Sequence, residues 1–215
     1  GGSAESRRKP RPRRMTEARP RVWVSQPLFD DVIERLREHF DVNAASEVTQ
    51  YAPEQITAAL RDVDGALITL NEGIGATQLK SAARLRAIAN VGVGYNNLDI
   101  PALQAVSIVA TNTPDVLTET TADFGFALMM ATARRITESE RWLREGHWQQ
   151  WSFQTMLGAD LHGSTLGILG MGRIGQGIAR RASGFDMRVL YHNRSRLPDA
   201  TERETRASYV GFDEL

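Results

Sequence analysis

The sequence contains no cysteine among its 215 residues. Disulfide bonds, catalysis by a thiolate and zinc sites built from cysteine are therefore excluded. A cysteine-free chain is compatible with a reducing compartment, and we expect the protein in the cytoplasm. We predict no metal site of any kind.

The chain also lacks a long hydrophobic run. No apolar segment approaches the roughly 18 residues that a membrane-spanning helix needs, and no apolar signal-peptide core is present near the start. Lysine and arginine total 26, aspartate and glutamate total 26, and the net charge is zero. This balance argues against a dedicated nucleic-acid or membrane-surface binder, so we expect neither as a partner.

The first 20 residues differ in composition from the rest. The segment GGSAESRRKPRPRR is basic, contains proline and has no apolar periodicity, so we predict that residues 1–20 form a disordered extension. Such a segment is typical of a nucleic-acid or nuclear-localisation arm. We favour a cloning remnant, or translated sequence upstream of a natural start at Met15, because the globular pattern begins shortly after Met15.

Beyond this extension, short apolar strands alternate with amphipathic helices. We predict strands at 21–26, 41–46, 65–70, 86–93 and 107–112, and helices at 30–40, 53–63, 76–86 and 100–106. Strands that alternate with helices of this length indicate a parallel sheet covered on both faces. The fold class is therefore α/β.

The next segment, 113–136, is rich in large apolar residues. Pro114 closes the preceding strand, and Thr118 or Thr120 is the candidate helix N-cap. Apolar residues then fall on all sides of the helix, which predicts a buried helix that connects two domains; they are Phe124, Phe126, Leu128, Met129 and Met130. A polar helix ending near Gly146 follows. After it, Trp148 and Trp151 are expected to pack against a neighbouring domain or subunit rather than to stack on a nucleotide.

A second strand–helix–strand pattern begins at Ser164. We predict strands at 164–170, 187–193 and 207–210, a turn and helix at 171–185, and a further helix that begins at Phe212. A doubly wound domain normally contains more strands than this. We therefore expect the chain to end inside its second domain.

Gly170, Gly172 and Gly175 form a GxGxxG motif between an apolar strand and a helix. In this setting the motif predicts dinucleotide binding. Gly170 permits the tight turn, Gly172 lets the backbone approach a pyrophosphate, and Gly175 lets the helix pack close to the strand. The backbone N–H groups of Arg173 and Ile174 are the expected phosphate donors, because a helix N-terminus favours anions.

The strand after this helix leads into Asn193, Arg194, Ser195 and Arg196, where an NAD-binding fold usually has an acid. An acid repels a 2′-phosphate, and Asn193 removes that repulsion. Arg194 and Arg196 can pair with a phosphate through charge-assisted hydrogen bonds, and Ser195 can donate another. We predict NADP(H) as the cofactor, with NAD(H) as the second choice. The alternative is that the arginines form an ordinary solvated surface.

These motifs together resemble the D-isomer-specific 2-hydroxyacid dehydrogenase family. NVGVGYNNLDI resembles its substrate loop, and GADLHGSTLGILGMGRIGQGIARRA resembles its cofactor signature. With REGHWQQW and YHNRSR, the combination is similar to the NADPH-linked glyoxylate/hydroxypyruvate reductases, including 2-ketogluconate reductases. The resemblance extends from Arg21 to Leu215.

The resemblance implies a flavodoxin-like substrate domain at 21–117, then the connecting helix and a partial Rossmann domain at 118–215, with the active site in the cleft between them. It implies that the N–H groups of Val91 and Gly92 hold the substrate carboxylate, and that Thr121 approaches the nicotinamide. A plain turn, in which Asn96, Asn97 and Asp99 cap the next helix, is the alternative for that loop. The resemblance also implies a homodimer formed through the arm around the connecting helix.

The family reduces a small 2-oxoacid with an arginine that clamps the keto acid, a histidine that donates the proton and a glutamate that orients the histidine. None of the four histidines here occupies a matching position, so we assign no catalytic residue in this chain and expect all three beyond Leu215. The implied substrate is glyoxylate, hydroxypyruvate or 2-ketogluconate, reduced by NADPH to the D-2-hydroxyacid. Phosphoglycerate and formate dehydrogenases are alternatives within the family. A non-catalytic NAD(P)-sensing scaffold, similar to the family's transcriptional corepressors, is the alternative of another class.

Overall fold

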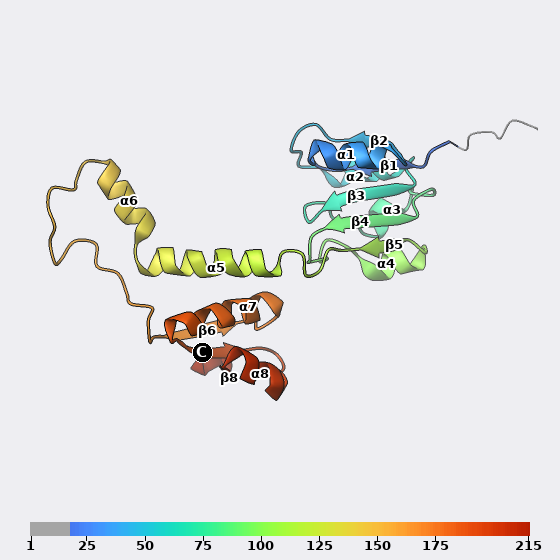
Figure 1. Cartoon of the computed structure of the whole chain (residues 1–215). Coiled ribbons are helices and arrows are strands. Elements are labelled where there is room, and N and C mark those ends of the chain that lie inside the picture. The colour runs from blue at the N-terminus through green and yellow to red at the C-terminus, as the bar shows by residue number, and fades with distance from the viewer. Residues whose placement is uncertain (1–17) are drawn as a thin grey trace, which may run out of the picture. The chain divides into compact units, whose positions relative to one another are not determined.

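The computed structural model describes residues 18–215 and divides the chain into two compact units, the first ending at Thr113 and the second beginning at Pro114 (Figure 1). The predicted disordered extension lies outside the described residues except for 18–20, which are exposed and have no regular structure. The substrate and cofactor roles expected for 21–117 and 118–215 stay predictions.

The first unit is built on a five-stranded parallel sheet with the order β2-β1-β3-β4-β5. Its strands are β1 (Arg21–Val24), β2 (Asp41–Ala44), β3 (Gly65–Thr69), β4 (Ala87–Val91) and β5 (Val109–Thr111). This is the flavodoxin-like strand order, in which the connections change direction between β1 and β3. The predicted flavodoxin-like fold of this unit is confirmed.

Four helices connect these strands: α1 (Asp30–Arg37), α2 (Pro53–Leu60), α3 (Ala76–Leu79) and α4 (Ile100–Ala105). Right-handed crossovers place α1 on one face of the sheet and α2, α3 and α4 on the other. The hydrophobic core includes Trp23, Leu60, Ile68, Ile88 and Leu103 and lies under these three helices. On the opposite face Val109 is 62% exposed, so within the described residues the expected cover of both faces is incomplete.

Side chains next to the helix starts satisfy free backbone N–H groups. Pro53 occupies the first turn of α2, and the side-chain oxygen of Gln55 accepts a hydrogen bond from the N–H of Ala52 at 2.8 Å. Asp99 accepts from the N–H of Ala102 at 3.0 Å and so caps α4. These contacts fix where each helix leaves the loop at the carboxyl end of a strand.

The second unit contains a three-stranded parallel sheet with the order β6-β7-β8, which confirms the predicted Rossmann-like fold of this unit. Its elements are α5 (Thr118–Ala133), α6 (Ile136–Arg144), β6 (Thr165–Leu169), α7 (Arg173–Ala182), β7 (Arg188–His192), α8 (Asp199–Thr205) and β8 (Ala207–Tyr209), with 3-10 turns at Ser183–Phe185 and Phe212–Glu214. Helix α8 was not predicted. Within residues 18–215, no helix is long and apolar enough to cross a bilayer, and no three acidic or histidine side chains are grouped as metal ligands would be.

Helix α5 packs along α7 (Figure 1). The approach is close because a Cβ on Gly177 would lie 2.8 Å from the Cβ of Ala122. Leu117, not Thr118 or Thr120, is the N-cap, and it makes no side-chain cap hydrogen bond. The predicted burial on all sides is also wrong: Phe126 is buried, but Phe124 is 68% and Leu128 is 56% exposed. The helix therefore presents an apolar face that the described residues of its own unit leave uncovered.

Candidate functional site

The glycine turn lies at the carboxyl ends of β6 and β7. Gly170 has φ of 95°, a left-handed conformation that glycine adopts without strain. Its N–H donates to the carbonyl of His192 at 3.0 Å, and the next N–H, of Met171, donates to Oδ1 of Asn193 at 2.7 Å. Asn193, predicted to relieve repulsion of a phosphate, thus also holds the turn against the end of β7.

The other two glycines of the motif have different surroundings. A Cβ on Gly175 would lie 2.6 Å from the carbonyl oxygen of Gly170, so only glycine lets α7 begin this close to the turn. At Gly172 a Cβ would meet nothing within 4 Å, so the backbone there is open to a ligand. The N–H groups of Arg173 and Ile174 open the helix and have no intrahelical acceptor. This arrangement fits an anionic group at the start of α7.

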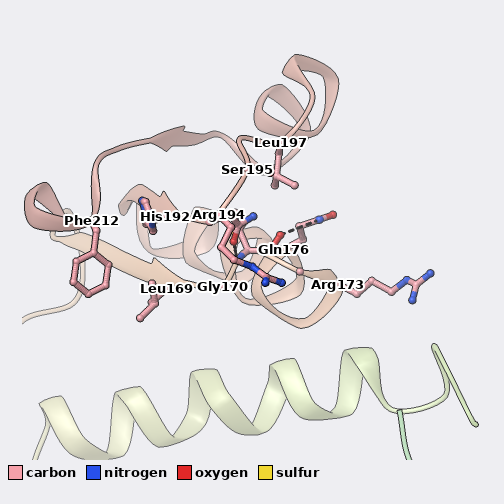
Figure 2. Close-up of a pocket in the computed structure, with 12 residues that line it drawn as sticks. Leu169, Gly170, Arg173, Gln176, His192, Arg194, Ser195, Leu197 and Phe212 are labelled. Atoms are coloured by element: carbon pink, nitrogen blue, oxygen red, sulfur yellow. Dashed lines mark hydrogen bonds between the residues drawn. The ribbon is translucent and has the colours of Figure 1, made fainter. Parts of the chain in front are cut away.

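A pocket of about 840 Å³ surrounds the turn (Figure 2). Its lining residues come from the end of β6, the start of α7, the end of β7 and the last 3-10 turn; they are Leu169, Gly170, Met171, Gly172, Arg173, Gln176, His192, Asn193, Arg194, Ser195, Leu197 and Phe212. Arg173 points away from the turn, and its Nε pairs with Asp115 at 2.9 Å. None of these lining residues is acidic.

The four residues after β7 do not all face this pocket. Asn193, Arg194 and Ser195 line it, and Figure 2 shows Arg194 beside the turn. Arg196 instead makes a bidentate contact with Glu202 of α8, from Nε at 2.9 Å and from Nη2 at 2.7 Å. Arg194 has no ion pair within residues 18–215. The predicted role of Arg196 at a 2′-phosphate stays a prediction, but its guanidinium is already paired.

Glu202 is the centre of a small polar cluster behind the Asn193–Leu197 loop. The hydroxyl of Tyr191, a fully buried side chain of β7, donates to Oε1 of Glu202 at 2.7 Å and accepts from the N–H of Leu197 at 2.8 Å. The hydrogen bonds from Arg196 and then Tyr191 lower the pKa of Glu202 to about 2. Burial and the hydrogen bond to Glu202 raise the pKa of Tyr191. The cluster therefore holds a carboxylate ion under the loop.

The far end of the pocket is aromatic. His192 stacks on Tyr209 with ring centroids 5.6 Å apart and meets Phe212 edge to face at 5.7 Å. His192, Phe212 and Leu169 line this end of the pocket and form a largely apolar wall suited to an adenine ring. The sequence alone places His192, one residue before Asn193, near the adenosine end, whereas Phe212 comes from a turn far along the chain and was not predicted. Thr121 of α5 is not among the residues that line this pocket.

The predicted substrate loop follows β4 in the first unit. Val91 is the last residue of the strand. The N–H of Gly92 donates to Oγ1 of Thr113 at 3.1 Å, so that donor is already engaged. The carbonyl of Val93 accepts a hydrogen bond from the side chain of Asn112 at 2.8 Å, and that of Gly94 accepts one from the side chain of Asn90 at 2.9 Å. Within residues 18–215, the N–H groups of Val93 and Gly94 have no hydrogen-bond acceptor.

A buried polar network supports this loop from below. Glu72 is 1% exposed. Its Oε1 accepts from Gln26 at 2.7 Å, and its Oε2 accepts from Ser25 at 2.8 Å and from the N–H and hydroxyl of Thr69 at 2.7 and 2.9 Å. Burial raises the pKa of Glu72, but these hydrogen bonds outweigh it and the net pKa is lowered.

Asn97 joins this network to the loop. Its Nδ2 lies 3.1 Å from the carbonyl of Thr69, 3.0 Å from that of Glu72 and 3.1 Å from Oδ1 of Asn90. Asp99 caps α4 as the plain-turn interpretation expects, but Asn97 ties together the ends of β3 and β4. Neither Glu72 nor Asn97 was predicted as a bridge, because the partners are scattered over four segments of the sequence.

Comparison with known proteins agrees with this geometry. Residues 126–215 match the family described as D-isomer specific 2-hydroxyacid dehydrogenase, NAD binding domain. A glyoxylate reductase of Thermococcus kodakarensis is 43% identical over 201 residues, which are 92% of this chain and 60% of that protein. The chain thus spans about 60% of the length of the curated relatives it matches.

Solved structures show the same relationship. An NADPH-dependent glyoxylate/hydroxypyruvate reductase from Sinorhizobium meliloti has a TM-score of 0.71 at 36% identity, over 84% of this chain and 56% of that one. A glyoxylate reductase from Paecilomyes thermophila has a TM-score of 0.74 at 28% identity, over 91% and 61%. Residues 126–215, with their glycine turn, belong to the D-isomer specific 2-hydroxyacid dehydrogenase family, and the chain as a whole is similar to members of that family.

Proposed function

We propose that this chain is the substrate-domain and cofactor-binding part of an NADPH-dependent oxidoreductase that reduces a small 2-oxoacid to the D-2-hydroxyacid. Glyoxylate is the first candidate substrate because curated relatives at about 40% identity are named glyoxylate reductases. Hydroxypyruvate and 2-ketogluconate remain candidates within the same reaction class. The catalytic arginine, glutamate and histidine that the resemblance implies, and the cytoplasmic location, remain predictions.

The observation that carries the cofactor proposal is the acid-free end of β7. Arg194 and Ser195 line the pocket, and none of its lining residues carries a carboxylate. A 2′-phosphate at this point would meet a guanidinium and a hydroxyl, both of which donate hydrogen bonds to it. The pyrophosphate would lie over Gly172 at the start of α7, and the adenine against His192 and Phe212. The nicotinamide supplies the hydride for the reduction.

For the substrate carboxylate, the loop after β4 offers two free donors. The N–H groups of Val93 and Gly94 are unpaired in the described chain, and asparagine side chains hold their carbonyls. Gly92, by contrast, already donates to Thr113. We therefore propose that the carboxylate is held two residues after the predicted Val91–Gly92 site, by the N–H groups of Val93 and Gly94. Backbone donors suit this task because they stay in place when the anion binds.

The cofactor assignment is tested by replacing Arg194 with glutamine. We expect the affinity for NADPH to fall by about tenfold, because one charge-assisted hydrogen bond to the 2′-phosphate is lost. The affinity for NADH should hardly change, since NADH has no phosphate at that position. Fluorescence titrations of both cofactors measure the ratio. Arg188→Gln, on β7 outside the pocket, is the matched control, and equal loss for both cofactors would contradict the assignment.

We further propose that the chain forms a homodimer through the arm that includes α5 and the segment after α6. Phe124, Leu128, Trp151, Phe153 and Leu157 are each more than half exposed, and large exposed apolar side chains mark interaction surfaces. Light scattering is expected to give a mass of twice 23.9 kDa. Replacing Phe153, which is 79% exposed, with aspartate should shift the protein toward the monomer. A mass of one chain for the unmodified protein would refute the proposal.

A further inference from the structure

Arg196 and Glu202 form an ion pair directly behind the loop that lines the cofactor pocket. Ser195 and Leu197, the neighbours of Arg196 in sequence, both line the pocket, whereas Arg196 does not. Its guanidinium makes two hydrogen bonds to the two oxygens of Glu202. The Glu202 side chain is only 11% exposed, and that of Arg196 is 60% exposed, so the arginine covers the carboxylate from the solvent side.

The second partner of Glu202 connects it to the strand. Tyr191 donates to Glu202 and accepts from the N–H of Leu197, so its hydroxyl joins β7, the loop and α8. An acid is thus held close to the end of β7, although none occurs in the sequence there. It comes from α8 and is neutralised by Arg196. Its charge would otherwise repel a phosphate bound on the loop.

We propose that Arg196 acts at this site as the counter-charge of Glu202 rather than as a ligand of the 2′-phosphate. Arg194 and Ser195 then bind the phosphate, and Arg196 neutralises the negative charge of Glu202 behind them, which would otherwise repel it. Arg196 and Glu202 are positioning and specificity residues. This inference rests on the proposed NADP(H) site and adds to it a second layer of residues.

The two roles of Arg196 predict different behaviour in variants. If Arg196 only cancels Glu202, then Arg196→Gln exposes an unpaired carboxylate and weakens NADPH binding, on the order of fivefold for a unit charge at this range. Removing both charges, in Arg196→Gln with Glu202→Gln, then restores the binding of NADPH. If Arg196 instead contacts the phosphate, the double variant stays as weak as Arg196→Gln alone.

The experiment is a fluorescence titration of the full 215-residue chain with NADPH and with NADH, for the wild type, both single variants and the double variant. The expected result is a ratio of NADPH to NADH affinity that falls in Arg196→Gln and recovers in the double variant. Glu202→Gln alone should raise the ratio, because Arg196 then becomes an uncompensated positive charge. All these shifts should shrink at high salt, as electrostatic effects near a surface do.

Two further variants distinguish the effect of the charges at Arg196 and Glu202 from effects of changed geometry or stability. Glu204→Gln removes an acid from the same helix, on an exposed position, and should leave the ratio unchanged. Arg196→Lys keeps the charge without the bidentate geometry and should keep most of the preference for NADPH. Unfolding in urea shows whether any variant has lost its fold. A destabilised fold alone would lower the affinities for NADPH and NADH equally.

The possible results distinguish a failure of this inference from a failure of the NADP(H) proposal. An Arg196→Gln variant with unchanged preference, or a double variant that does not recover, overturns the inference while the NADP(H) proposal stands. A wild-type chain that binds NADH as tightly as NADPH overturns the cofactor proposal and, with it, this inference. A chain that binds neither overturns both.

Discussion

Replacing Gly172 with alanine is expected to weaken NADPH binding about 100-fold while leaving the free energy of unfolding unchanged. A Cβ at Gly172 would meet no protein atom within 4 Å, so the fold tolerates it. The same Cβ would occupy the space that a pyrophosphate needs at the start of α7. Overpacking of this kind costs about 1–3 kcal/mol, which is up to roughly 100-fold in affinity. Cofactor titration and urea unfolding measure the two effects.

Two other glycine variants serve as comparisons for Gly172→Ala. Gly184→Ala also adds a Cβ in open space, but outside the pocket, and should affect neither binding nor stability. Gly175→Ala would place its Cβ 2.6 Å from the carbonyl oxygen of Gly170, so it should destabilise the second unit and weaken binding together. A Gly172→Ala variant that binds NADPH normally would show that the glycine turn is not the pyrophosphate site.

The sequence pattern predicted the strands well because each is a short apolar run between turn residues. It overestimated the length of the helix expected at 76–86, because the helix in the structure ends at Leu79. Leu79, Ala82 and Leu85 are all buried at a spacing of three, and this spacing imitates a helix. In the structure these residues lie in successive turns. The N–H of Ala82 donates to the carbonyl of Leu79, and the N–H of Leu85 donates to the carbonyl of Ala82, both at 3.1 Å.

Helix α8 shows the opposite failure. Its sequence, DATERET, has no apolar periodicity, and Thr205 is its only buried residue within the described chain. Hydrophobic pattern therefore gave no signal for it. Because α8 supplies Glu202, the partner of Arg196 was also hidden from sequence reasoning. The NRSR segment was identified as a functional feature, but which arginine faces the ligand depends on this unpredicted helix.

The glycine motif was the most predictable part of the site, since its chemistry is local. The turn, the helix start and the strand end are joined by short contacts between residues that the motif itself specifies. The substrate loop was less predictable. The N–H of Gly92 is engaged by Thr113, and the carbonyl of Val93 is held by Asn112. Neither Thr113 nor Asn112 belongs to the loop sequence.

Replacing Glu72 with alanine is expected to destabilise the first unit by about 3–5 kcal/mol, since it leaves several buried donors without an acceptor. The donors are the side chains of Ser25 and Gln26 and two groups of Thr69. Urea unfolding, followed by the fluorescence of the buried Trp23, measures the loss. Glu54→Ala, at an exposed position in the first turn of α2, is the matched control and should change stability by under about 1 kcal/mol.

The same carboxylate gives the effect a defined pH dependence. The pKa of Glu72 is lowered in the folded state from its ordinary value of 4.5, so its charged form stabilises the fold fully above that value. This stabilisation is lost as the pH falls through the lowered folded-state pKa. The stability difference between the wild type and Glu72→Gln should therefore be largest near neutral pH and should shrink below about pH 4. A difference that stays constant down to pH 3 would mean that shape and packing at Glu72, rather than its charge, hold the ends of β1 and β3 together.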